Sequence, residues 1–116
     1  MAANKITGDR GEQIAVDYIQ KKGYEVLKRN YRYKRAEIDI IAKANNLLVF
    51  FEVKTRYGLH FGYPEEAVDE KKAEMVIMAA NNFIYETEWE SEIRFDIIAV
   101  SLDQELKIDH FEDAFF

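Results

Sequence analysis

Four charged residues stand inside two strongly hydrophobic segments of this sequence. Residues 37–54 read EIDIIAKANNLLVFFEVK, which places Glu37, Asp39, Glu52 and Lys54 where a plain core strand would carry valine or leucine. A buried carboxylate is costly unless it shares a proton, pairs with a cation or binds a metal ion. The segment therefore points to a charged site held on rigid strands.

The elements that would position these charges are two β-strands joined by a tight turn. Residues 37–42 and 47–54 are rich in β-forming residues. Asn45 and Asn46 tolerate the left-handed backbone conformation that a two-residue hairpin turn requires. The sequence therefore predicts a β-hairpin.

The predicted turn also fixes which residues face each other. It would set Asp39 opposite Glu52, and Glu37 opposite Lys54. Because side chains alternate between the two faces of a strand, all four charges would share one face. The apolar neighbours on the first strand would share the opposite face: Ile38, Ile40 and Ala42.

Opposed carboxylates at Asp39 and Glu52 would repel each other, and Lys54 can balance only one negative charge. Mg²⁺ or Mn²⁺ suits such a pair, since these ions take one or two carboxylates and leave other sites for water and phosphate. In phosphodiester hydrolysis such an ion lowers the pKa of the attacking water and stabilises the leaving oxygen. The alternative is a set of ordinary surface ion pairs, and a register shifted by two residues would place Asp39 against Phe50.

The rest of the sequence predicts two helices and three further strands. Apolar residues recur at helical spacing over residues 9–22, with Asp9 as the candidate cap and Gly23 as the stop, and again over residues 67–85. Strands are expected over 24–27, 93–101 and 106–110, and a loop with glycine, proline and exposed aromatic residues over 55–66. The predicted order is α-β-β-β-α-β-β, which is an α/β fold.

The composition is that of one folded domain. The chain has 116 residues, of which 48% are hydrophobic and 14% aromatic, and this is enough for one core. It has no cysteine, which excludes disulfides and thiolate metal sites and favours a cytoplasmic protein. No segment resembles a leader peptide or a membrane span. We expect a single soluble domain over residues 1–116.

Charge is distributed unevenly along the chain, whose net charge is −6. Residues 21–35 hold seven basic residues and one acidic residue, whereas the chain from residue 86 onward holds ten acidic and two basic residues. The basic stretch, with tyrosines between its charges, could follow a phosphate backbone, and the alternative is a solvated strand and loop. The small basic footprint suggests that a second copy, forming a homodimer, or another partner is needed to grip a duplex.

Asp39, followed thirteen positions later by Glu52-Val53-Lys54, resembles the PD-(D/E)xK nuclease signature. Ile38 stands where that signature has proline. Nearly the whole chain resembles, in the order and spacing of its motifs, the YraN-like family of small bacterial proteins regarded as endonucleases. The motifs are GEQIAVDYIQKKGYEVLKRNYR, AEIDIIA, FFEVKTR, FGYPEEAVDEKK, RFDIIAV and HFEDAF. The resemblance implies a restriction-endonuclease-like fold, a central mixed β-sheet flanked by helices, related to Holliday-junction resolvases.

The same resemblance assigns roles to individual residues. It implies that Glu12, Asp39 and Glu52 ligate Mg²⁺ or Mn²⁺ and act in catalysis, and that Lys54 positions or activates the attacking water. From the residues alone, Glu12 would instead be a capping-box glutamate three residues after Asp9.

We therefore expect a Mg²⁺-dependent endonuclease that acts on DNA, including branched or junction DNA. The alternative is a nuclease-fold module that binds nucleic acid or a protein partner with little or no catalysis. Lys71 or Lys72 matches a family lysine that lies beside the site or is solvated, while Glu37 and His60 have no assigned role. Nucleic-acid contacts are expected from Arg29, Arg32, Lys34, Arg35, Arg56 and Lys72.

Overall fold

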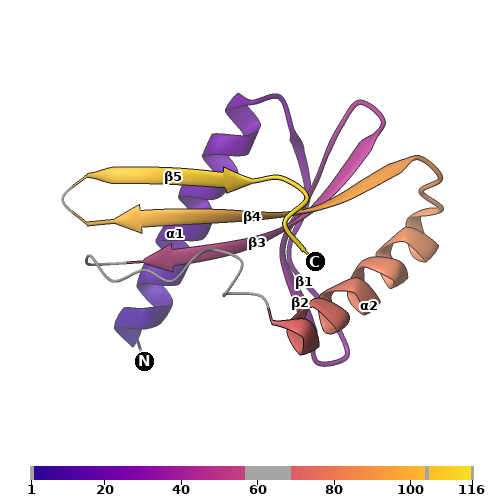
Figure 1. Ribbon diagram of the computed structural model, residues 1–116, viewed down its shortest axis with the longest axis horizontal. Helices are drawn as coiled ribbons and strands as arrows, with labels where there is room; N and C mark the ends of the chain where they lie inside the picture. The colour runs from indigo at the N-terminus through magenta and orange to yellow at the C-terminus, as the bar shows by residue number, and fades with distance from the viewer. Residues whose placement is uncertain (1, 57–68, 104, 116) are drawn as a thin grey trace.

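The computed structural model describes residues 2–56, 69–103 and 105–115, with side chains from residue 8 onward. Figure 1 shows a five-stranded sheet accompanied by two helices. The elements are α1 (Ala2–Lys21), β1 (Glu25–Tyr33), β2 (Ala36–Ala44), β3 (Leu47–Arg56), α2 (Glu70–Thr87), β4 (Glu92–Leu102) and β5 (Leu106–Phe111). This order confirms the predicted α/β fold. Most of the predicted loop 55–66, including His60, lies outside the described residues.

The sheet is mixed and has the strand order β1-β2-β3-β4-β5. β3 and β4 are parallel, and the other neighbouring pairs are antiparallel. Two parallel strands need a crossover connection, and α2 lies in that connection. The first turns of α2 consequently lie beside the carboxyl-terminal part of β3.

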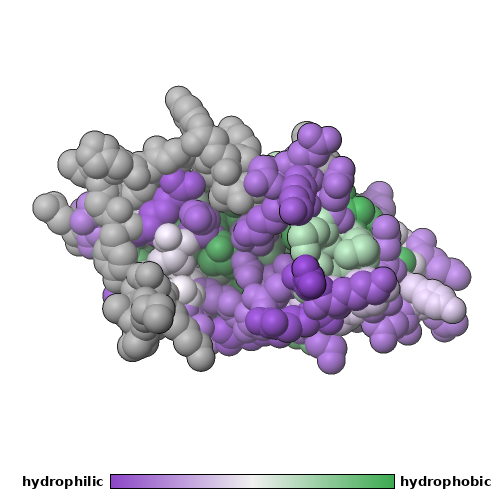
Figure 2. Space-filling model, turned by 90° about the horizontal axis from the view of Figure 1, so that it is seen from below, coloured by the Kyte–Doolittle hydropathy of each residue, from purple (hydrophilic) through white to green (hydrophobic). Residues whose placement is uncertain are grey.

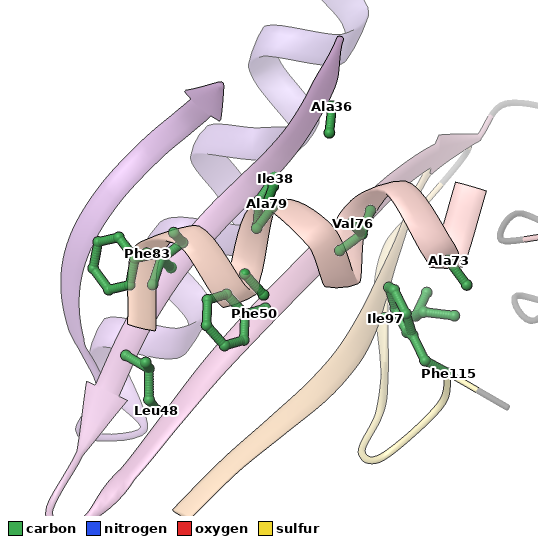
Figure 3. Packing of buried hydrophobic residues seen from close by; sticks show 12 residues of the cluster. Ala36, Ile38, Leu48, Phe50, Ala73, Val76, Ala79, Phe83, Ile97 and Phe115 are labelled. Carbon is green, nitrogen blue, oxygen red and sulfur yellow. The ribbon is translucent and has the colours of Figure 1, made fainter. Parts of the chain in front are cut away.

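Hydrophobic residues pack on both faces of the sheet. On one face α2 lies over the strands, and Figure 3 shows Phe83 of α2 close to Phe50 of β3. On the other face α1 packs against the sheet through Ala15, Val16 and Ile19. β3 contributes to both clusters, which explains its continuous apolar run LLVFF.

Helix α1 begins earlier than the sequence predicted. It starts at Ala2, so Asp9 lies inside the helix and the prediction of a cap at Asp9 was wrong. The residues before Asp9 lack an apolar periodicity, so the sequence pattern placed the start of the helix at residue 9. The predicted end is confirmed, because α1 ends at Lys21 and Gly23 has a φ of +98°, a conformation that favours glycine.

The hairpin of β2 and β3 forms with the predicted register. Asn45 in its turn has a φ of +55°, and the ladder runs from the pair of Ala44 and Leu47 to the pair of Ile40 and Phe51. It stops one position short of the predicted pair of carboxylates.

The alternation of side chains breaks at Asp39, contrary to the prediction. Ile38 packs in the cluster under α2, whereas Ile40 packs in the cluster under α1, so these residues do not share a face. The neighbouring strand is irregular at the same place, where Asn30 has a φ of +53°. At this break the Asp39 carboxylate reaches β3 and accepts a hydrogen bond from the Val53 amide at 2.7 Å.

A buried polar cluster ties β4 to β5. The fully buried carboxylate of Asp96 accepts two hydrogen bonds from Arg94, both at 2.8 Å, and one from the Asp113 amide at 3.0 Å. The Nε2 atom of His110 lies 2.7 Å from the same carboxylate, and its Nδ1 atom lies 3.2 Å from the Tyr18 hydroxyl of α1. Burial alone would raise the pKa of Asp96, but the bonds from His110 and Arg94 hold that pKa below its ordinary value.

The surface on the side of α2 is mainly hydrophilic, with smaller hydrophobic areas between the polar residues (Figure 2). Large hydrophobic side chains that are exposed among the described residues are Met78, Tyr85, Ile93 and Leu106. Neither helix in the described part of the chain combines the length and the apolar character needed to cross a membrane.

Candidate active site

Three carboxylates and two cations line one pocket between the sheet and α2. The pocket has a volume of about 270 Å³ and is bounded by the β1–β2 turn, by β2 and β3, and by the first turns of α2. Its charged lining consists of Arg35, Glu37, Asp39, Glu52 and Lys72. The structure thus brings together two of the predicted metal ligands and two of the predicted nucleic-acid contacts.

Asp39 is an acid of this pocket with a raised pKa. Burial raises the pKa of Asp39 to about 7, and the negative charge of Glu52 adds to the effect. The hydrogen bond from the Val53 amide and the charge of Lys72 act in the opposite direction without cancelling it. Near neutral pH Asp39 is therefore partly protonated unless a cation stabilises its charge.

Glu52 has a cationic partner on α2. Its side chain is 8% exposed and forms an ion pair with the ammonium group of Lys72, whose side chain is 45% exposed. Lys72 is placed in the first turn of α2 by the cap residue Asp69, whose side chain accepts the Lys72 backbone N–H at 2.8 Å. The lysine that the sequence assigned to nucleic acid therefore contacts a predicted metal ligand directly.

Glu12 lies on α1 and is held by β1. Its buried carboxylate accepts hydrogen bonds from Arg29 Nε at 3.2 Å and from Asn30 Nδ2 at 3.0 Å. Because Glu12 lies well inside α1, the capping-box reading of this residue was wrong. Its charge contributes to the raised pKa of Asp39, less than the charge of Glu52 does. The role of Glu12 as a metal ligand stays a prediction.

A close approach between α1 and β3 determines where Glu12 lies. A Cβ atom at the buried Gly11 would stand 1.9 Å from Oγ1 and 2.9 Å from Cβ of Thr55. Only glycine fits at this contact without a shift of Thr55 or of the helix. The contact brings the helix turn that carries Glu12 against the end of β3.

Lys54 lies two residues after Glu52 on β3 and is exposed. Alternation along the strand puts it on the same face as Glu52. It is not among the described residues that line the pocket. Its predicted role with the attacking water stays a prediction.

The other basic candidates are spread along β1, the β1–β2 turn and the end of β3. Arg32 pairs with Glu37 at 2.9 Å, and Lys34 occupies the turn with a φ of +57°. Arg35 is exposed and lines the pocket, whereas Arg56 is half-buried at the end of β3. Among these residues, Arg35 is the one best placed for a phosphate near Asp39.

The donor set fits a hard divalent cation through two residues. Asp39 and Glu52 offer carboxylate oxygens in one pocket, and Mg²⁺ commonly takes one or two carboxylates. In residues 2–56, 69–103 and 105–115, no three acidic or histidine side chains gather closely enough to hold a metal ion together. A bound ion would therefore take its remaining ligands from water and substrate.

Two ion pairs of the candidate site could not be predicted from the sequence. Lys72 with Glu52 and Arg29 with Glu12 join residues that lie 20 and 17 positions apart. No periodicity or motif links the members of either pair, because tertiary packing brings them together.

Comparison with known proteins places the chain among relatives of similar length. A family model described as "Uncharacterised protein family UPF0102" matches residues 11–100. A UPF0102 protein of Flavobacterium psychrophilum is 45% identical over 117 residues, covering 100% of this chain and 98% of that protein. A UPF0102 protein of Chlorobium phaeobacteroides is 47% identical, with coverages of 93% and 91%. A UPF0102 protein of Clostridioides difficile is 45% identical, with coverages of 97% and 98%.

Proposed function

The chain belongs to the uncharacterised protein family UPF0102, and we propose that it is a divalent-metal-dependent nuclease that hydrolyses phosphodiester bonds in DNA. The observation that carries this proposal is the pairing of Asp39 with Glu52 in one pocket beside Arg35 and Lys72. Paired carboxylates attract a metal ion and cations attract phosphate, so the pocket combines the two recognition elements that phosphodiester hydrolysis requires.

In this proposal Asp39 and Glu52 would hold Mg²⁺ or Mn²⁺. The bound ion would lower the pKa of the attacking water and stabilise negative charge at the leaving oxygen. The Val53 amide occupies Oδ2 of Asp39 and leaves Oδ1 for a ligand. Arg35 contacts a phosphate oxygen at the mouth of the pocket. Lys54, exposed on the same face as Glu52, supplies positive charge near the attacking water.

The proposed substrate is DNA with branched or junction structure. The cationic turn of Lys34 and Arg35 beside the pocket can contact a phosphate backbone over a short length only. A small footprint is easier to reconcile with a bent or branched substrate, or with two copies acting together, than with one copy on a straight duplex.

Cleavage assays with the purified protein test the proposal. Single-stranded, duplex, flapped and four-way DNA are incubated with Mg²⁺ or Mn²⁺, and Asp39→Asn and Glu52→Gln are compared with the exposed control Glu90→Gln. Each pocket variant should lose at least about 100-fold in cleavage rate, while the control should keep the wild-type rate. If the wild type cuts none of these substrates, or if the pocket variants cut equally well, the proposal fails.

A second candidate function is a DNA-binding module with little catalysis. Two observations favour it: Lys54 does not line the pocket, and the carboxylate of Glu12 is already occupied by a hydrogen bond from Arg29. This module would bind junction DNA with the same affinity in the wild type and in Glu52→Gln, and neither protein would cut it. Binding and cleavage measured on the same samples separate the two functions.

A further inference from the structure

We propose that Lys72 is a built-in competitor for the divalent cation at Glu52, an inference that rests on the proposed function. Without an ion, the Lys72 ammonium neutralises Glu52. When an ion binds, Lys72 has to give up this contact. The pocket thus exchanges an internal cation for an external one.

The first support is the environment of Glu52. Its side chain is 8% exposed, and a carboxylate that is nearly buried needs a cationic or hydrogen-bonding partner. The Lys72 ammonium contacts Oε1 of Glu52 and lines the same pocket as Asp39. A divalent ion held by the same two carboxylates would be repelled by an ammonium group at this place. Simultaneous occupancy is therefore unfavourable.

The second support is that Lys72 can leave without disturbing the fold. Its side chain is 45% exposed and has a long flexible stem. Its backbone is fixed separately, since the Lys72 N–H is bound by the Asp69 cap. Only the side chain has to move when the ion enters.

Comparison with the other ion pair of the site shows what a fixed partner looks like. Arg29 donates from Nε to Glu12 and from a terminal nitrogen to Gln13 at 2.8 Å, so two bonds to α1 hold its guanidinium. Lys72 has a single carboxylate partner among the contacts found in the described residues. Lys72 is the replaceable counterion of the site and Arg29 the permanent one.

The exchange has a consequence for the substrate. A Lys72 ammonium released from Glu52 remains beside a pocket that Arg35 also lines. Both cations are then available to phosphate oxygens. Ion binding therefore prepares the pocket for the substrate in addition to supplying the metal.

Mn²⁺ titration of the protein without DNA tests the competition, with binding measured by calorimetry and by the rise in melting temperature. Lys72→Met should bind Mn²⁺ about tenfold more tightly than the wild type, because the competing ion pair is gone. Its melting temperature should be lower without Mn²⁺ and should rise more on addition of Mn²⁺. Lys71→Met removes the same charge from the neighbouring exposed position and should bind as the wild type does.

Lys72→Arg keeps a cation with a better geometry for a carboxylate, so it should bind Mn²⁺ no more tightly than the wild type. Glu52→Gln should abolish the binding. If Glu52→Gln abolishes binding while Lys72→Met leaves the affinity unchanged, the competition is refuted and the proposed function stands. If the wild type and Lys72→Met both fail to bind Mn²⁺, the metal-dependent function itself is refuted.

Discussion

The carboxylate of Asp39 accepts the backbone N–H of Val53 at 2.7 Å, just beyond the point where the ladder between β2 and β3 ends. A side chain thus takes the place of the next backbone hydrogen bond. Because Val53 directly follows Glu52, this bond keeps the carboxylates of Asp39 and Glu52 close together. Their mutual repulsion does not stabilise the fold. Such an arrangement is typical of a preorganised binding site.

The first prediction concerns Asp39→Asn and the dependence of stability on pH. The folded-state pKa of Asp39 is about 7, above its ordinary value of 3.8, so the folded protein binds this proton more tightly than the unfolded chain. As the pH rises from about 4 to about 7, Asp39 ionises in the unfolded chain before it ionises in the folded protein, so the wild type loses stability, by up to about 4 kcal/mol. Asp39→Asn lacks this loss and should unfold at higher urea concentration than the wild type at pH 8.

The control for this measurement is Glu90→Gln, at an exposed position away from the pocket. Its stability should follow the wild-type pH profile. Equal stability of Asp39→Asn and the wild type at pH 8 would contradict the raised pKa. Addition of Mg²⁺ should raise the stability of the wild type at pH 8 and leave that of Asp39→Asn nearly unchanged.

The second prediction concerns the contact between Gly11 and Thr55. Gly11→Ala should destabilise the protein by about 1–3 kcal/mol, because the added methyl group overlaps with the Thr55 side chain. Gly8→Ala is a matched control in the same helix, where an added Cβ atom meets nothing within 4 Å, and it should be neutral or stabilising by up to about 1 kcal/mol. Thermal unfolding measures both. Equal effects of the two substitutions would show that α1 does not approach β3 this closely.

The third prediction concerns the buried cluster around Asp96. Asp96→Ala removes the buried carboxylate from Arg94, which keeps the more exposed Glu112 at 3.6 Å, and should cost about 3–5 kcal/mol. The lowered pKa of Asp96 means that its ionised form stabilises the fold above pH about 4, and that this stabilisation is lost as the pH falls further. The free energy of unfolding should therefore fall less steeply below pH about 4 in Asp96→Ala than in the wild type. Asp103→Asn, at an exposed site, should leave the acid transition where it is.

The fourth prediction separates two arginines of the β1–β2 hairpin. Arg35 lines the pocket, whereas Arg32 is paired with Glu37. Arg35→Gln should weaken DNA binding and reduce the slope of the logarithm of the binding constant against the logarithm of salt concentration by about one. Arg32→Gln should change the slope by less, because its charge is already partly neutralised. Fluorescence anisotropy over a salt series measures the slopes, and the reverse order would place the phosphate elsewhere on the hairpin.

Much of the fold could be predicted because its signals are local. The Asn45-Asn46 pair and the apolar runs on either side of it predict the register of the hairpin, and Gly23 predicts the end of α1. These features depend on residues within a few positions of one another, so a pattern in the sequence is enough to find them.

The parts that were missed depend on the tertiary structure. The break in alternation at Asp39 arises where β1 is also irregular, at Asn30, and neither residue alone predicts it. The early start of α1 has no apolar pattern to reveal it. The cation beside Glu52 comes from a helix that follows in the crossover, so the electrostatics of the candidate site could not be derived from the spacing of the carboxylates.

The crossover that carries Lys72 also predicts an order of folding events. Asp39 and Glu52 belong to one hairpin, and local hairpins form quickly, within about 1–10 μs. Lys72 reaches them only after the chain has closed the much longer loop that pairs β3 with β4, which is a slower, non-local step. We therefore expect the folding chain to bring the two carboxylates together before their counterion arrives. A divalent cation should accordingly speed the folding reaction of this protein as well as occupy its finished site.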